Sequence, residues 1–365
     1  MTTTETETAA PVEERRFPCA QCGANLRYTP GQTSMTCSYC GHEQDIPEAD
    51  HATRDAALRP LDLRAGLSRR LPDSEIEVTR VLNCTNCGAQ VEFEPNTHAA
   101  ECPFCATPVV TDTGTNRHIK PQAVLPFALG EREAKESFSK WLKGLWFAPN
   151  GLRKFARSDS RFAGIYVPYW AFDADTHSDY TGERGTYYYT GSGKERQRHT
   201  RWTRVSGRVA RRFEDLLIMA SESLPRRYVR ALEPWDLQAL KPYDPSFLSG
   251  FRAEAYSVEL APGWEIARER MDEVIRQDVR RAIGGDEQRI SSLATETDAE
   301  MFKHLLLPLW VAAYRYRDRS FRFVVNAQTG KVRGERPWSV WKIAGAVLLG
   351  VIVVGGWFYL SGAGQ

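Results

Sequence analysis

The sequence contains no cysteine after Cys105, and none of its eight cysteines lies outside a Cys-x-x-Cys pair. A disulfide framework usually spreads its cysteines over the domain that it cross-links, so this distribution argues against one. Residues 1–16 lack the apolar stretch of a secretory signal peptide. We therefore expect the thiols to remain reduced in the cytoplasm.

A large excess of charge of either sign is also missing, since the 365-residue chain has a net charge of +2. The overall charge therefore demands neither nucleic acid nor a membrane surface as a partner. The sequence has no GxxxxGK[ST] phosphate-binding loop, no dinucleotide-binding fingerprint and no nucleophile motif. These absences leave no support for an ATPase or a dinucleotide-dependent enzyme, and we predict a protein that is not an enzyme.

What the sequence does contain is a duplicated cysteine module. The stretch CAQCGANLRYTPGQTSMTCSYC recurs 65 residues later as CTNCGAQVEFEPNTHAAECPFC. Both copies share all cysteine positions and a following Gly-Ala, amide, aromatic and proline pattern. The cysteines are Cys19, Cys22, Cys37, Cys40, Cys84, Cys87, Cys102 and Cys105.

Two Cys-x-x-Cys pairs at this separation are typical of a zinc ribbon, in which four thiolates hold one Zn²⁺ tetrahedrally. Bound zinc would supply most of the folding free energy of so small a module, on the order of 10 kcal/mol. Gly23, Gly41 and Gly88 follow a second cysteine, where a knuckle often needs positive φ, and Ala106 takes the fourth such place. We predict two zinc ions, one per ribbon. A redox pair at Cys102–Cys105 and iron on the same ligands are the alternatives.

An uncharged run of 18 residues, IAGAVLLGVIVVGGWFYL, occupies positions 343–360. As a helix it would span about 27 Å, close to the hydrocarbon thickness of a bilayer. Aromatic residues flank the run and basic residues precede it. This pattern predicts a single-pass, tail-anchored protein of the cell membrane whose N-terminal body faces the cytoplasm. A buried core helix is the alternative.

The whole chain is expected to be an α+β protein with several parts. In order these are a disordered tail (1–16), zinc ribbon 1 (17–47), a partly helical linker (48–80), zinc ribbon 2 (81–112), an α+β body (117–338) and a transmembrane helix (343–360). Within the body, apolar stripes predict helices over 131–146 and 264–283. A Pro-x-Trp sequence follows each helix, at 168–170 and at 308–310. We therefore predict an internal duplication of a strand–helix–strand–strand unit.

Two charged segments of the body are candidate sites, and the first is FDADTHSD. Its residues Asp173, Asp175, His177 and Asp179 alternate, so a strand would place them on one face. Such a face could hold a hard metal ion or carry out acid–base chemistry. A half-buried strand with a solvated face is the interpretation that we favour.

The second segment, KERQRHTRWTRVSGRVARR, spans positions 194–212 and carries eight basic residues but a single acid. It could contact the phosphates of nucleic acid or the headgroups of anionic lipids. A solvated basic hairpin is the alternative. The candidate contact residues are Lys194, Arg196, Arg198, Arg201, Arg204, Arg208, Arg211 and Arg212.

The chain resembles a family of bacterial membrane proteins with TFIIB-type zinc ribbons, often named after the primosomal helicase PriA because of their cysteines. The matching stretches include FPCAQCGANLRYTPGQ, VPYWAFDADTHSDYTGERGTYYY and VVNAQTGKVRGERPWS. The resemblance implies a membrane-bound zinc protein with SPFH or phage-shock-type envelope-stress proteins as partners, and it implies no catalytic residue. Ala106 departs from the usual knuckle glycine. The helicase label does not transfer, because no ATPase motif is present.

Three functions follow from these observations as hypotheses. The first is a non-enzymatic zinc-binding adaptor or scaffold that recruits a protein at the cytoplasmic face of the membrane. The second is a nucleic-acid-binding protein that uses the ribbons and the 194–212 segment. The third is a hydrolase or metal enzyme that uses Asp173, Asp175, His177 and Asp179.

Overall fold

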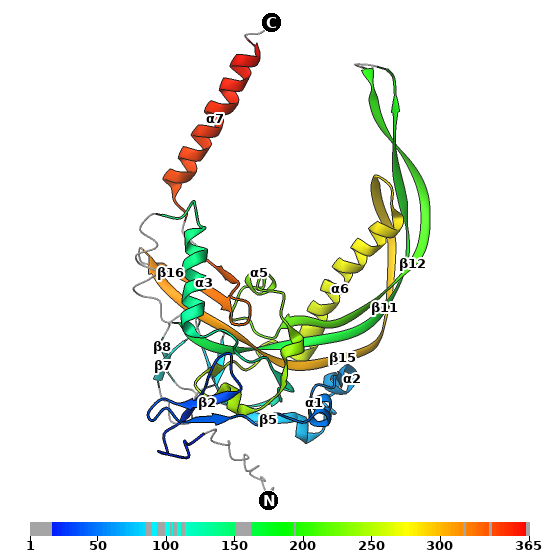
Figure 1. Ribbon diagram of the computed structural model, residues 1–365. Helices are drawn as coiled ribbons and strands as arrows, with labels where there is room; N and C mark the ends of the chain where they lie inside the picture. Colours follow the sequence, from blue (N-terminus) through cyan, green and yellow to red (C-terminus); the bar gives the residue numbers. More distant parts are fainter. Residues whose placement is uncertain are drawn as a thin grey trace, which may run out of the picture.

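The computed structural model of the chain describes residues 17–84, 89–92, 99–102, 104, 108–110, 114–149, 162–192, 195–316, 319–335 and 338–362. A mixed α+β body lies at the centre, and two long projections leave it on the same side (Figure 1). The first, which we call the arm, contains the outer parts of β11 (Ala163–Thr190), β12 (Gln197–Met219) and β15 (Glu287–Tyr316), with helix α6 (Leu260–Ile283) against them. The second is helix α7 (Val340–Gly362).

A nine-stranded sheet forms the middle of the body and continues into the arm, with a main path β12-β11-β15-β10-β13. β11 and β15 pair antiparallel from Ala163↔Val311 to Gly185↔Glu287. Every residue from Ile165 to Phe172 is buried, because this part of β11 is covered on both faces. The remaining strands of the sheet are β4 (Leu61–Asp62), β10 (Ala123–Val124), β13 (Lys241–Pro242), β14 (Arg252–Ala253), β16 (Arg319–Asn326) and β17 (Val332–Gly334).

The short strand that precedes each long helix of the body pairs with the long strand that follows the other helix. β10 precedes helix α3 (Glu131–Lys143) but lies parallel beside β15, whereas β14 precedes α6 but lies parallel beside β11. The tryptophans of the two Pro-x-Trp sequences follow the same exchange. Trp170 Nε1 donates to the Val258 carbonyl at 2.9 Å, and Trp310 Nε1 donates to the Leu129 carbonyl at 2.8 Å. The duplication stays a prediction from the sequence.

Both helices that the apolar stripes predicted are present. α3 begins at Glu131 and ends at Lys143, three residues short of the predicted end, because Gly144 interrupts it. α6 begins at Leu260, four residues before the predicted start, and ends before Gly284, which adopts a positive φ of 67°. The residues that α6 buries are Leu260, Gly263, Trp264, Ala267, Met271, Ile275, Val279 and Ile283.

Smaller elements complete the fold. The predicted linker contains α1 (His51–Ala57) and α2 (Leu63–Leu67), and an aspartate accepts a backbone hydrogen bond at the start of each. The other short helices are α5 (Arg226–Arg230), η1 (Asp73–Glu75), η3 (Leu237–Ala239) and η4 (Pro245–Leu248). The strands outside the large sheet are β1 (Leu26–Tyr28), β2 (Ser34–Cys37), β3 (Glu43–Asp45), β5 (Ile76–Asn83), β6 (Gln90–Glu92), β7 (Ala99–Glu101), β8 (Pro108–Val110) and β9 (Gly114–Ile119). The predicted disordered tail, 1–16, lies outside the described residues.

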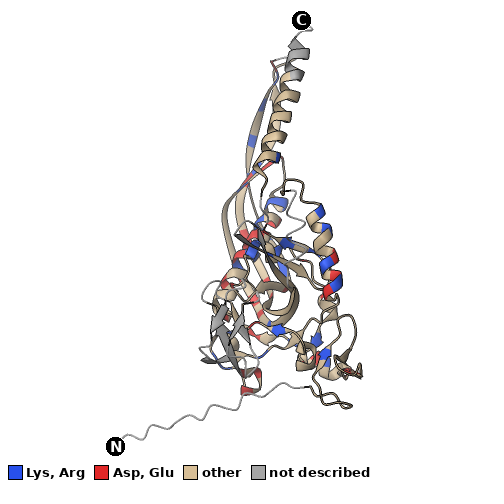
Figure 2. Ribbon diagram, turned by 90° about the vertical axis from the view of Figure 1, so that its left-hand side faces the viewer, with Lys and Arg blue, Asp and Glu red and all other residues tan. Residues whose placement is uncertain are grey.

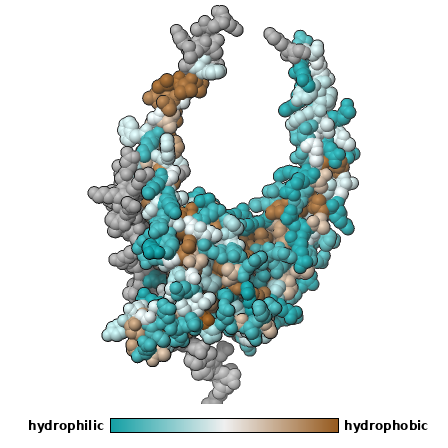
Figure 3. Space-filling view, viewed as in Figure 1, coloured by the Kyte–Doolittle hydropathy of each residue, from teal (hydrophilic) through white to brown (hydrophobic). Residues whose placement is uncertain are grey.

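Helix α7 contains the apolar run that the sequence predicted to cross a membrane, and many of its described apolar side chains are exposed (Figure 3). Among the described residues, however, no helix combines the length and the apolar character that a membrane crossing requires. The predicted transmembrane helix at 343–360 was therefore wrong, and so was the single-pass, tail-anchored location in the cell membrane.

Candidate metal centre and charged arm

The first cysteine module folds as a three-stranded antiparallel sheet of β1, β2 and β3. Each Cys-x-x-Cys turn is closed by a backbone hydrogen bond, from Gly23 N to the Cys19 carbonyl at 2.9 Å and from Gly41 N to the Cys37 carbonyl at 3.0 Å. Both glycines adopt positive φ, 74° and 73°. This is the backbone conformation predicted for these knuckles, and it is strained for a residue with a Cβ.

The four cysteine side chains of this module converge. The sulfurs of Cys19, Cys22, Cys37 and Cys40 all lie within 4.8 Å of one another. Cys19 Sγ is 3.6 Å from Cys40 Sγ, and Cys22 Sγ is 3.5 Å from Cys37 Sγ. Two sulfurs of a tetrahedral site with Zn–S bonds of about 2.3 Å are about 3.8 Å apart. These four cysteines could therefore hold a metal ion with little adjustment.

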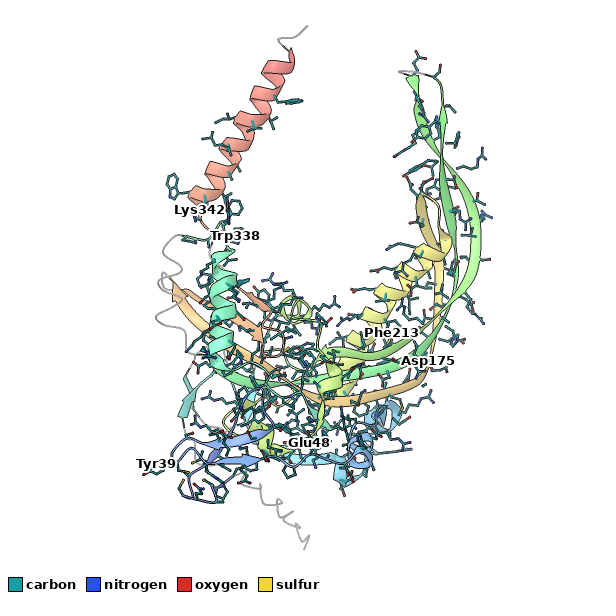
Figure 4. All side chains as sticks on the ribbon, viewed as in Figure 1. Tyr39, Glu48, Asp175, Phe213, Trp338 and Lys342 are labelled. Carbon is teal, nitrogen blue, oxygen red and sulfur yellow. The ribbon has the colours of Figure 1, made fainter. Side chains whose placement is uncertain are left out.

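The backbone around the second knuckle favours the charged form of one ligand. The N–H groups of Cys40 and Tyr39 donate hydrogen bonds to the Cys37 sulfur, and they lower the pKa of this thiol to about 6. The thiolate is the form of cysteine that binds a metal ion. Tyr39 itself points away from the body at the outer edge of the ribbon (Figure 4) and is 84% exposed.

This ribbon packs against the body and is not a separate domain. Tyr28 packs edge-on against Phe247 with ring centroids 5.4 Å apart, and its backbone N–H donates to the Ser249 carbonyl at 2.9 Å. Gly31 N donates to the Phe127 carbonyl at 2.8 Å. Cys19 and Cys37 lie in the same buried cluster as residues of α3, β15 and β16. The metal site is therefore coupled to the packing of the body.

The second cysteine module is described only in part, because Cys87 and Cys105 lie outside the described residues. Cys84 and Cys102 are buried and belong to one apolar cluster of the body. The described strands repeat part of the first module 65 residues later: β7 pairs with β8 in the register of β2 with β3, and Asn83↔Gln90 corresponds to the bridge Pro18↔Asn25. A pairing of β6 with β7 like that of β1 with β2 is not seen among the described residues, and neither are all four sulfurs. A second metal site is therefore not shown, and the second zinc ion stays a prediction.

The four alternating residues of β11 do share one face, but they do not form a pocket. His177 and Asp179 are exposed, and the intervening side chains of β11 are buried. Asp179 accepts two hydrogen bonds from Arg208, at 2.7 and 2.6 Å, and Asp175 lies 3.7 Å from Arg212. Asp175 and Phe213 mark where the arm leaves the body (Figure 4). Among the described residues, only the four cysteines of the first module bring potential metal ligands together in such a group.

The basic segment forms most of β12, and its residues divide into two groups. Those nearest the body form ion pairs with aspartates: Arg208–Asp179, Arg211–Asp278 and Arg212–Asp175. Those nearest the end of the arm, Arg196, Arg198 and Arg201, lie over tyrosine rings of β11. Arg204 lies between the two groups, and Lys194 is outside the described residues.

A buried polar cluster surrounds a small cavity that the sequence did not indicate. His118, Glu254 and His304 line it together, and each is less than 9% exposed. His304 Nδ1 lies 2.7 Å from the Ile119 carbonyl. A carbonyl only accepts, so Nδ1 carries the proton of the neutral ring. Within the described part of the chain, His304 Nε2 and both ring nitrogens of His118 have no hydrogen-bond partner.

Burial sets the charge of this cluster. It lowers the pKa of His304 to about 4 and also lowers the pKa of His118. It raises the pKa of Glu254 to about 8, although the hydroxyls of Ser221 and Ser223 donate to this carboxyl group and oppose the shift. All three side chains are therefore neutral near pH 7. The three come from distant segments, and no short motif marks any of them.

Comparisons with known proteins give one similarity over almost the full length. No family model matches the chain. No solved structure matches it. The chain is similar to the uncharacterized protein YdjG of Bacillus subtilis (strain 168), with 25% identity over 329 residues, which cover 90% of this chain and 92% of that protein. The name of this relative assigns no function, so the resemblance to TFIIB-type zinc-ribbon proteins stays an expectation.

Proposed function

We propose that this protein is a non-enzymatic, zinc-binding adaptor whose arm is its main contact surface. The arm is the observation that carries this proposal. β11, β12 and β15 contain 28, 23 and 30 residues, whereas strands of globular proteins usually contain about 5–6. At ~3.3 Å per residue, β11 alone extends roughly 90 Å.

The outer part of the arm adds surface without adding a core. The side chains of α6 cover one face of the arm only as far as Ile283, near the pair Gly182↔Ile290. β15 stops pairing with β11 at Gly185↔Glu287, and beyond this pair only the hairpin of β11 and β12 remains. The surface of the arm is mostly hydrophilic (Figure 3). A segment of this kind stabilises the fold very little, so its role lies in contacts with another molecule.

Zinc is the metal that fits the first cysteine module best. Four thiolates at tetrahedral spacing are the ligand set of structural zinc sites, which leave no open position for a substrate. The ion would tie the ribbon to the body. The resemblance noted from the sequence makes SPFH or phage-shock-type proteins the first candidates for the partner.

We expect that shortening the arm removes the contacts of the protein and leaves its fold intact. Replacing Thr186–Arg201 with Asn-Gly would join Gly185 to Trp202, which are already paired, through a tight type I′ turn. The thermal midpoint should change by less than about 2 °C, because no buried core is lost. Chemical cross-linking in cells followed by mass spectrometry should recover far fewer partner proteins with the shortened chain.

The matched control is Tyr39→Ala, which changes an exposed side chain of the ribbon. This variant should keep the cross-linked partners of the full chain. If the shortened chain recovers the same partners in the same amounts, the arm is not the contact surface and the proposal fails.

A further inference from the structure

We propose that the tip of the arm binds single-stranded nucleic acid. The tip is defined here as Thr186–Thr190 of β11, Arg196 with the first part of β12 as far as Trp202, and Arg289 of β15. This inference rests on the proposed role of the arm as a contact surface, and it names one class of ligand for that surface.

Aromatic rings and guanidinium groups alternate on one face of the tip. The guanidinium of Arg196 lies 4.0 Å from the ring centre of Tyr189, and that of Arg198 lies 4.2 Å from the ring centre of Tyr187. The guanidinium of Arg289 lies 3.8 Å from the ring of Trp202. Tyr189 pairs with Arg198 across the hairpin, so these side chains lie on the same face.

The opposite face repeats the arrangement on a smaller scale. Tyr188 stacks on His199 with ring centroids 5.4 Å apart, and the guanidinium of Arg201 lies 5.4 Å from the Tyr188 ring. Tyr188 is 41% exposed and Tyr189 is 52% exposed. Large aromatic side chains with this exposure on both faces of a thin hairpin have no core to pack against. They are available to stack on a ligand.

The three arginines nearest the end of the arm differ from Arg289, which lies 3.7 Å from Glu183 in an ion pair. Among the described residues, no carboxylate forms an ion pair with Arg196, Arg198 or Arg201, whereas Arg208 and Arg212 are both paired with aspartates. Lys and Arg positions recur along the arm (Figure 2). A guanidinium that stacks on a ring keeps its N–H groups free at its edge, and these can bind a phosphate in a bidentate manner. Arg196 directly precedes β12 and Arg198 is the second residue of that strand, so the two guanidinium groups are close along the chain.

The combination of free guanidinium groups and exposed rings favours a single-stranded nucleic acid over other anions. An acidic peptide or an anionic lipid surface would use the charges but would leave the rings without a planar partner. An unpaired base offers a flat face to each ring, and the backbone offers regularly spaced phosphates. Bases within a duplex are already stacked and would not reach these rings.

The test measures binding of a fluorescently labelled 20-nucleotide oligo-dT to the full chain by anisotropy over a series of salt concentrations. If about three phosphates are neutralised, log K should fall with log[salt] with a slope near −2, since single strands give about −0.7 per phosphate. The triple variant R196Q/R198Q/R201Q should bring the slope close to zero. The double variant Y188L/Y189L should weaken binding by about 5–150-fold per lost stack and leave the slope unchanged.

The charge-matched control is R268Q/R276Q/R281Q, which removes three exposed arginines of α6. It should keep both the affinity and the slope. All the substitutions are at exposed positions, so each variant should keep its fold. An unchanged circular dichroism spectrum checks this before binding is measured.

Three results would overturn the proposal: no binding of oligo-dT by the wild-type chain, equal binding by the triple variant, or binding to anionic phospholipid vesicles in place of the oligonucleotide. The two proposals can be told apart. If shortening the arm removes protein cross-links but the wild-type chain does not bind oligo-dT, the adaptor role stands and the nucleic-acid ligand is wrong.

Discussion

Replacing Cys22 with serine is expected to remove one equivalent of bound zinc and to lower the thermal stability of the whole protein. Cys22 is one of four sulfurs within 4.8 Å of one another, and a site with three thiolates binds zinc far more weakly. Losing even a supporting hydrogen bond of a ligand costs about 10–100-fold in affinity, so losing a ligand should cost more. A metal bound at 1,000 times its Kd contributes about 4 kcal/mol to the free energy of unfolding.

The effect should extend beyond the ribbon, because Cys19 and Cys37 share a buried cluster with the body. The zinc content is measured by inductively coupled plasma mass spectrometry and the thermal midpoint by calorimetry. Ser38→Ala, in the other knuckle of the same site, is the control and should change neither value. Retention of all bound zinc by C22S would show that the four sulfurs are not the ligands.

The same measurement tests the second module. The wild-type chain should contain two zinc equivalents, and Cys87→Ser should lose one of them. A wild-type content of one equivalent, lost completely in C22S, would mean that only the first module binds zinc.

Lowering the pH below about 6.5 is expected to destabilise the protein through His304. Its pKa is about 4 in the folded state but about 6.5 in the unfolded chain. Between these values the unfolded chain binds a proton that the folded protein does not, so the free energy of unfolding falls as the pH falls. The loss is about 1.4 kcal/mol per pH unit, and in total about 3 kcal/mol by pH 4. The contribution is fully present above pH 6.5.

The variant His304→Asn should remove this dependence, because an amide does not titrate and its Nδ2 can still donate to the Ile119 carbonyl. Glu254 has a pKa of about 8 in the folded state. Its contribution to the free energy of unfolding therefore falls as the pH rises between about 4.5 and 8, which is opposite to the contribution of His304. The informative quantity is therefore the difference between the variant and the wild-type chain in urea unfolding at each pH. The exposed His51→Asn is the control. Parallel curves for H304N and wild type would show that His304 titrates normally in the fold.

The part of this protein that could be predicted from the sequence is the part set by short-range spacing. The first four cysteines, their glycine knuckles and the stripes of α3 and α6 all depend on residues within a few turns of one another. The alternating Asp173–Asp179 face was also predictable, because strand geometry has a period of two. Its pairing with Arg208 and Arg212 depends on the register of β12, which the sequence did not indicate.

The features that sequence reasoning missed depend on contacts between distant segments. The cavity joins His118, Glu254 and His304, and only the folded sheet brings them together. The length of the arm follows from the pairing of β11 with both β12 and β15. The membrane prediction relied on the absence of charge from 343–360, and no helix among the described residues meets the requirement for a membrane crossing.

The exchange of first strands between the two halves of the body has a consequence for synthesis on the ribosome. β10 pairs with β13 and with β15, and its partner in β15 emerges about 180 residues after it, which takes roughly 10–40 s at ordinary rates of translation. During this interval the apolar strand from Ile165 to Phe172 has no β15 to cover it, and it is open to aggregation. All four ligands of the first metal site, in contrast, have been translated by Cys40. The nascent chain can therefore capture its metal ion long before the sheet that the ribbon packs against can close.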